Sequence, residues 1–222
     1  MIITHYGHAC VLLELPSRDR PARILIDPGS YSTDYAGLRD LDAILITHAH
    51  PDHLDVDGVT ALVEHNPNAQ LLHGPAAAVA LAERAISGRV VEPGTTVSVR
   101  GIRIVVTGGE HACIHPDLPG SENNGYLIAD TVFHPGDSFD LPPSTADTVL
   151  IPAGGPWMKI GEAIDYLRAT APRLAIPIHQ AGLAHAHQQM HYGLLRKLAP
   201  EPTEVLVLDH ATPYTVRAGG PE

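Results

Sequence analysis

The chain has few of the residues that mark an exported or membrane-bound protein. Its 222 residues include only two cysteines, Cys10 and Cys113, and neither belongs to a Cys-x-x-Cys pair. Isolated cysteines of this kind are typical of reduced thiols in the cytoplasm. No apolar run approaches the roughly 20 residues that span a bilayer, and the first residues lack the charged and apolar regions of a signal peptide. We therefore expect a cytoplasmic protein with no membrane partner.

Basic residues are also scarce. Lysine occurs only at Lys159 and Lys197, and 14 Lys and Arg residues stand against 25 Asp and Glu, which gives a net charge of −11. Nucleic-acid binding needs a basic surface for the phosphates, so no nucleic-acid partner is expected. A small anionic substrate stays open, because bound metal ions would reverse the local charge.

The order of the expected elements indicates one domain over residues 1–222, of the α/β class. Apolar runs typical of strands come first and then alternate with helical patterns, and this happens in two successive rounds. No Ser-rich or Gly-rich linker separates the rounds, and the chain is long enough to bury a large core. The pattern predicts two β-sheets packed face to face, with helices outside.

Histidine, in contrast, is abundant, with 15 residues, and its densest cluster follows an apolar strand over residues 43–47. The cluster reads His48-Ala49-His50-Pro51-Asp52-His53. Alternate residues of an extended segment share a face, so His48 and His50 point the same way. Asp52 and His53, which follow the proline, can face a second point beside the first. The spacing therefore predicts two neighbouring metal ions.

Other metal-binding residue types follow further apolar strands. Asp27 follows residues 24–26, Asp137 follows residues 132–134, and His179 follows residues 175–178. His111 follows residues 104–107 after a short Gly-rich gap, at the start of an expected loop over residues 108–124. Loops of this length in a compact domain are usually functional, and His115 in the same loop competes with His111 for the role of ligand. If these strands share an edge, their polar ends converge on the cluster.

These motifs, in this order, resemble the five-motif signature of the metallo-β-lactamase-fold hydrolases over nearly the whole chain. Three flanking segments look most like the branch that contains ascorbate-6-phosphate lactonase-like proteins and N-acyl-phosphatidylethanolamine phospholipase D. These segments are Gly7-His8-Ala9-Cys10, His134-Pro135-Gly136-Asp137-Ser138 and Pro177-Ile178-His179.

The resemblance implies a four-layer αββα sandwich with a dinuclear metal site. The first ion would be held by His48, His50 and His111. The second would be held by Asp52, His53 and His179. Asp137 would bridge the two ions, and Asp27 would support a ligand or its loop from behind. Zinc is the first choice of metal, and manganese and iron also suit imidazole and carboxylate ligands.

The resemblance also implies the chemistry. Two such ions share a water whose pKa falls toward neutrality, and the bridging hydroxide attacks a carbonyl or phosphorus centre. Asp52 would orient this hydroxide. The expected reaction is hydrolysis of a small ester, lactone or phosphodiester. Because Asp137 stands where lactamases with zinc–thiolate ligation have a cysteine, that subclass is not expected.

Several assignments stay open at this stage. His8, Trp157 and Lys159 are candidates for substrate binding. His185 is a candidate proton donor, and His134 a candidate support for the ligands. Two other functions stand beside the hydrolase: a mononuclear iron oxidoreductase, as in persulfide dioxygenase-like relatives, and a binding protein without activity. A homo-oligomer is also open, and the substrate is an unspecified small molecule.

Overall fold

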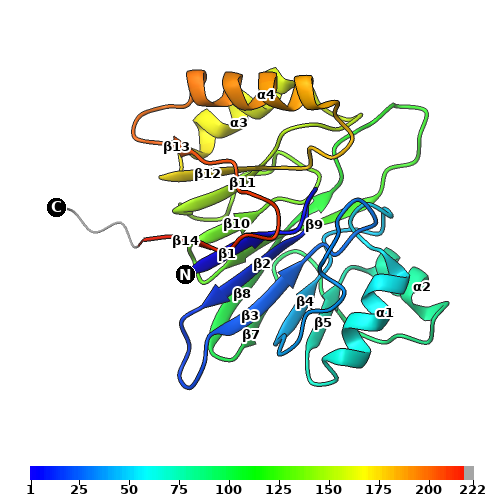
Figure 1. Cartoon of the computed structure of the whole chain (residues 1–222). Coiled ribbons are helices and arrows are strands. Elements are labelled where there is room, and N and C mark those ends of the chain that lie inside the picture. The colour runs from blue at the N-terminus through cyan, green and yellow to red at the C-terminus, as the bar shows by residue number, and fades with distance from the viewer. Residues whose placement is uncertain (218–222) are drawn as a thin grey trace.

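The computed structural model describes residues 1–217 and confirms the expected αββα sandwich. Two seven-stranded sheets pack face to face. Helices α1 (Val56–His65) and α2 (Pro75–Ala82) cover the outer face of the first sheet. Helices α3 (Ile160–Thr170) and α4 (His185–Leu198) cover the second. In Figure 1 the two pairs of helices lie on opposite sides of the strands.

The first sheet has the strand order β14-β1-β2-β3-β4-β5-β6. Its strands are β1 (Ile2–His5), β2 (Val11–Leu15), β3 (Ala22–Ile26), β4 (Ala43–Leu45), β5 (Gln70–His73), β6 (Arg89–Val90) and β14 (Tyr214–Thr215). Strands β3 to β6 run parallel to one another, whereas β2 pairs antiparallel with β3 and β14 pairs antiparallel with β1. The first and last strands of the described chain are therefore adjacent.

The second sheet has the order β13-β12-β11-β10-β9-β8-β7. Its strands are β7 (Thr96–Val99), β8 (Ile102–Glu110), β9 (Glu122–Ile128), β10 (Val132–His134), β11 (Thr148–Pro152), β12 (Leu174–Ile178) and β13 (Glu204–Val205). Strands β10 to β13 are parallel to one another. Each sheet therefore has a parallel half, and polar residues at the ends of its strands can meet at one edge.

The central strands are apolar throughout because both of their faces are buried. In β3, Ile24 and Ile26 point into the core between the sheets, whereas Leu25 packs under α1 and α2. Successive side chains of a strand point to opposite faces, so an unbroken apolar run fits a strand covered on both sides. This rigid packing fixes the ends of the strands, from which the polar cluster extends.

The loop expected over residues 108–124 is shorter than the sequence indicated, because both of its ends are strand. Strands β8 and β9 pair as far as Glu110 and Glu122, and only residues 111–121 form the loop. Gly108 and Gly109 have φ values of 83° and 143°, so these glycines bend β8 rather than end it. Asn123, which falls within the expected loop, lies fully buried in β9.

Residues 1–217 include no helix that is long and apolar enough to cross a bilayer.

Candidate metal centre

The polar residues that follow separate strands meet at one edge of the sandwich. The first sheet supplies Asp27 at the end of β3, the segment 48–53 after β4, and His8 in the turn between β1 and β2. The second sheet supplies His111 after β8, Asp137 after β10 and His179 after β12. A backbone hydrogen bond of 2.8 Å from His179 N to His8 O joins the sheets directly at this edge. The convergence expected from the sequence is therefore present.

The candidate ligand atoms form three overlapping groups, and within each group they lie within 4.8 Å of one another. The first group contains His48, His50 and His111. The second contains His8, Asp52, His53 and His179. The third contains His48, His53 and Asp137 and lies between the other two. Apart from His8, these are the seven residues expected to be ligands. Between His111 and His115, the structure brings His111 to the cluster, whereas His115 is exposed.

The hydrogen bonds of three rings show that their inner nitrogens suit a metal ion. The Nδ1–H of His53 donates to Asp27 Oδ2 at 2.7 Å, that of His111 donates to Ala112 O at 2.6 Å, and that of His179 donates to Gly154 O. In each ring this leaves the Nε2 lone pair facing the cluster, and all three Nε2 atoms are buried without a hydrogen-bond partner among the described residues. Metal-binding histidines are typically held in this way. The residues therefore fit divalent ions.

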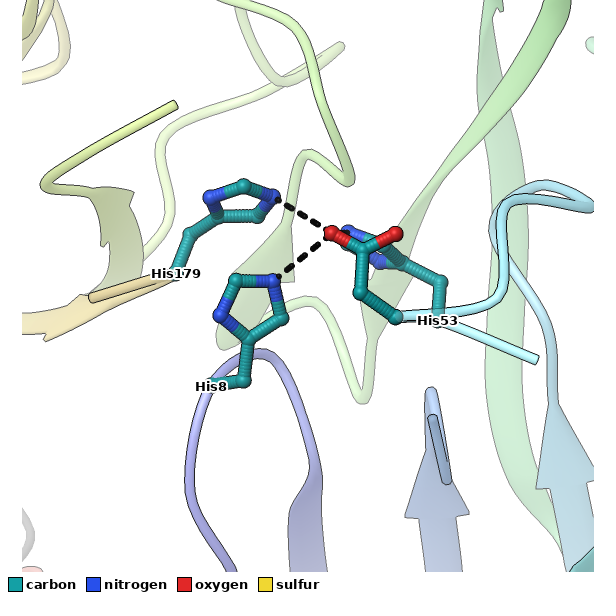
Figure 2. A group of neighbouring side chains, drawn as sticks. His8, His53 and His179 are labelled. Carbon is teal, nitrogen blue, oxygen red and sulfur yellow. Dashed lines mark hydrogen bonds and ion pairs between the residues drawn. The ribbon is translucent and has the colours of Figure 1, made fainter. Parts of the chain in front are cut away.

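His8 has the opposite arrangement. Its Nδ1 accepts a hydrogen bond from Ala181 N at 3.3 Å, so its Nε2 carries the proton and donates to Asp52 Oδ2 at 3.0 Å. Figure 2 shows His8 and His179 directing ring nitrogens toward that same carboxylate. Burial lowers the pKa of His8 to about 4, so the ring is neutral. His8 therefore positions Asp52 rather than offering a lone pair to a metal.

Asp137 is the centre of the cluster. Its Oδ2 lies 3.0 Å from His179 Nε2 and 3.3 Å from His111 Nε2, and its Oδ1 lies 3.1 Å from His53 Nε2. The Trp157 indole N–H donates to Oδ2 at 2.8 Å. Asp137 thus contacts one histidine from the first sheet and two from the second.

Burial and the neighbouring charges shift the pKa values of the cluster residues in different directions. Burial lowers the pKa of His48 well below its ordinary value, which leaves a neutral ring. Burial also opposes a charge on His53, but the carboxylates of Asp137 and Asp27 outweigh it and raise the pKa of His53 well above its ordinary value. Burial likewise opposes the charge on Asp137, but His53 holds the pKa of this carboxyl well below its ordinary value. Without a metal, His53 therefore carries a second proton, on Nε2, in addition to the one on Nδ1. A metal cation can replace this second proton.

A buried hydroxyl and a glycine support the segment 48–53. Thr47 donates both its backbone N–H and its Oγ1 hydroxyl to the Asp27 carboxylate, at 2.8 and 2.7 Å. Gly29 packs directly on the segment, because a Cβ built there would lie 1.8 Å from Asp52 O. No side chain other than hydrogen fits at this approach, so Gly29 is required for the position of Asp52.

The remaining candidates lie outside the cluster or behind it. His134 is buried, with Nε2 donating to Ala9 O at 3.1 Å and Nδ1 accepting from Gly136 N at 3.0 Å, so it braces two loops. Lys159 is exposed at the start of α3, and His185 is exposed at the start of α4. Neither side chain lines a cavity at the cluster. The structure therefore does not bring Lys159 and His185 to the metal ligands.

Trp157, expected at the substrate, instead packs behind the ligands. It is only 7% exposed, and its ring lies 6.0 Å from that of His111 and 5.9 Å from that of His179. Sequence reasoning also missed Thr47 and Asn123, whose Oδ1 accepts from Asp137 N at 3.0 Å. The sequence gives little indication of the role of Thr47, because threonine is common in strands. Asn123 was included in the expected loop over residues 108–124, so its role in holding Asp137 was not predicted.

Replacing Trp157 with phenylalanine is expected to weaken metal binding by about 10–100-fold, because the ring is kept while the N–H to Asp137 is lost. Competition with a chromogenic chelator measures the dissociation constant. Phe139→Leu is the control, since Phe139 packs 5.2 Å from the Trp157 ring without touching Asp137. Equal metal affinity in Trp157→Phe and Phe139→Leu would show that the hydrogen bond from the indole to Asp137 does not affect metal binding.

Comparisons with known proteins agree with this geometry. A model of the beta-lactamase superfamily domain matches residues 2–179. Protein Rv0786c of Mycobacterium tuberculosis is 41% identical over 96% of this chain and 100% of its own. A UPF0173 metal-dependent hydrolase of Methanocaldococcus jannaschii is 28% identical over 80% of this chain and 83% of its own. The metallo-beta-lactamase fold protein YhfI from Bacillus subtilis superposes with a TM-score of 0.70 at 14% identity, covering 96% of this chain and 98% of that one.

The finer placement beside ascorbate-6-phosphate lactonases stays a prediction. The family itself is shown by the match over residues 2–179 together with the ligand order along the chain. The chain belongs to the beta-lactamase superfamily domain family and has the metallo-β-lactamase fold.

Proposed function

We propose that this metal-dependent hydrolase works with two divalent ions and cleaves a small ester, lactone or phosphodiester. The observation that carries the proposal is the division of seven donors into two groups with Asp137 between them. A mononuclear site would use only one of the two groups. The Nε2 atoms of His53 and His179, which belong to the second group, would then stay buried with neither a hydrogen-bond partner nor a metal. Buried polar atoms without partners are costly, so both groups are best explained as ligand sets.

Each residue has a distinct place in the proposed site. His48, His50 and His111 would hold the first ion. Asp52, His53 and His179 would hold the second, and Asp137 would contact both. When bound, such a pair of ions lowers the pKa of a water toward neutrality and polarises the carbonyl or phosphoryl oxygen of the substrate.

The chain itself orients the reacting groups. The hydrogen bond from His8 fixes one oxygen of Asp52, and despite the effect of burial this contact lowers the pKa of Asp52 to about 2. Asp52 is therefore a carboxylate that can accept a hydrogen bond from the attacking water and orient it. His8 keeps its proton on Nε2 and so prevents Asp52 from turning away.

The test combines metal counting with a substrate panel. Purified protein loaded with Zn²⁺, Mn²⁺ or Fe²⁺ is analysed by elemental mass spectrometry and assayed on p-nitrophenyl esters, lactones and bis(p-nitrophenyl) phosphate. We expect two ions per chain and hydrolysis that disappears when the ions are removed. Lys197→Ala, on the exposed surface of α4, serves as the control and is expected to match the wild type. One iron per chain at full activity would contradict the dinuclear site.

A further inference from the structure

A cavity of about 380 Å³ opens beside Asp52 and His179, on the side of the cluster opposite His50. Small-molecule sites commonly have volumes of this order. A ligand in this cavity would contact the group proposed to orient the attacking water. We therefore expect the part of the substrate next to the reacting atom to lie in this cavity.

The walls of the cavity are apolar or glycine. Apart from the cluster residues His8, Asp52 and His179, the lining consists of Tyr31, Pro51, Pro156, Leu183 and three glycines at positions 154, 155 and 182. Leu183 fits closely against the floor, since a Cβ built on Gly154 would lie 2.6 Å from its Cδ1. The Tyr31 ring packs edge-on against His8 at 5.2 Å and is 57% exposed, so it stands at the mouth.

Among residues 1–217, no lysine or arginine lines this cavity or the larger one of about 730 Å³ on the His50 side. The larger cavity contains Glu110 and Glu122 instead. A second anionic group on a substrate is normally held by Arg or Lys. Nothing in the described lining of either cavity supplies that cation.

We propose that this cavity binds an uncharged, apolar acyl group, so that the substrate is a neutral ester or lactone rather than a phosphorylated or carboxylated one. This inference rests on the proposed hydrolase function. In the reaction, the water oxygen bonds to the acyl carbon, the bond from that carbon to the leaving oxygen breaks, and the proton of the water passes to the leaving alcohol. Leu183 and Tyr31 then determine the size and polarity of the accepted acyl group.

The inference is tested with two esters of equal acyl length, p-nitrophenyl butyrate and p-nitrophenyl hemisuccinate, on the metal-loaded enzyme. We expect kcat/KM for the butyrate to exceed that for the hemisuccinate by at least about 100-fold, because a carboxylate buried against Leu183 has no partner. Leu183→Arg is expected to shrink this ratio at least about 10-fold. Leu141→Arg makes the same change at an exposed leucine outside both cavities and is expected to leave the ratio unchanged.

A binding measurement separates this inference from the proposed function. The p-nitroanilides of butyrate and succinate present the same acyl groups and resist hydrolysis, so their dissociation constants are measured by calorimetry even if no ester is cleaved. Tighter binding of the butyryl compound, lost in Leu183→Arg, supports the cavity whether or not the enzyme hydrolyses esters. Equal or tighter binding of the succinyl compound, or an equal kcat/KM for both esters, overturns it. Failure to cleave any substrate of the panel with two ions bound would instead overturn the proposed function.

Discussion

Asp137→Asn is expected to lower kcat/KM by at least about 10³-fold and to reduce the metal content below two ions per chain. The carboxylate contacts His53, His111 and His179, and Asp137 is the residue that we propose contacts both ions. Asparagine keeps the shape and an oxygen for the Trp157 N–H but removes the charge. The metals contribute several kcal/mol of transition-state stabilisation, which corresponds to a rate factor of about this size.

Metal content and kcat/KM are measured on the same preparation of Asp137→Asn. Asp140→Asn is the matched control, since this carboxyl lies three positions further along the chain and its residue is exposed. It is expected to retain two ions and full activity. If Asp137→Asn kept both, Asp137 could not be the bridging ligand, and the site would need another residue between the two groups.

Removing the metals with a chelator is expected to lower the melting temperature by about 10 °C, and adding Zn²⁺ or Mn²⁺ back should restore it. The ligands come from both sheets, so bound ions stabilise the sandwich only in its folded form. A ligand present at about 1,000 times its dissociation constant stabilises by about 4 kcal/mol. For a chain of this size, each kcal/mol shifts the melting temperature by about 2–4 °C.

Scanning calorimetry with and without chelator measures this shift. His179→Ala removes one ligand supplied by the second sheet, so its chelator-induced shift should be clearly smaller than that of the wild type. The emission of Trp157, which is the only tryptophan of the chain, gives an independent signal through its contact with Asp137. Identical melting curves in the two conditions, with active enzyme in both, would show that ions do not join the sheets.

The sequence predicted the sandwich and the convergence of the ligands for the same reason. An apolar run such as residues 43–46 can be buried on both faces only in a layered sheet, and a polar residue directly after it must lie at the edge. His48, Asp137 and His179 each follow such a run, so their meeting point depends on strand order alone. The strand order follows from the general rules for connecting parallel strands, and it does not depend on the conformation of individual loops.

The roles of the supporting residues could not be predicted in this way. Whether a histidine offers a lone pair or a proton depends on the partner of its other nitrogen, and for His8 that partner is Ala181, 173 positions away. Trp157 likewise reads as an apolar wall until its N–H is seen on Asp137. His185 was a candidate proton donor at the site. However, α4 begins at His185 after an exposed turn, and the His185 side chain faces solvent.

The pairing of β14 with β1 has a consequence for the order in which the protein is made. Strand β1 is made long before β14, so one of its edges stays open until residues 214 and 215 have been synthesised. Throughout that interval the N-terminal sheet presents an unpaired edge strand, which can pair with a strand of another nascent chain. The first sheet is therefore completed only after most of the described chain has been made, and the yield of folded protein should depend on chaperone capacity during synthesis.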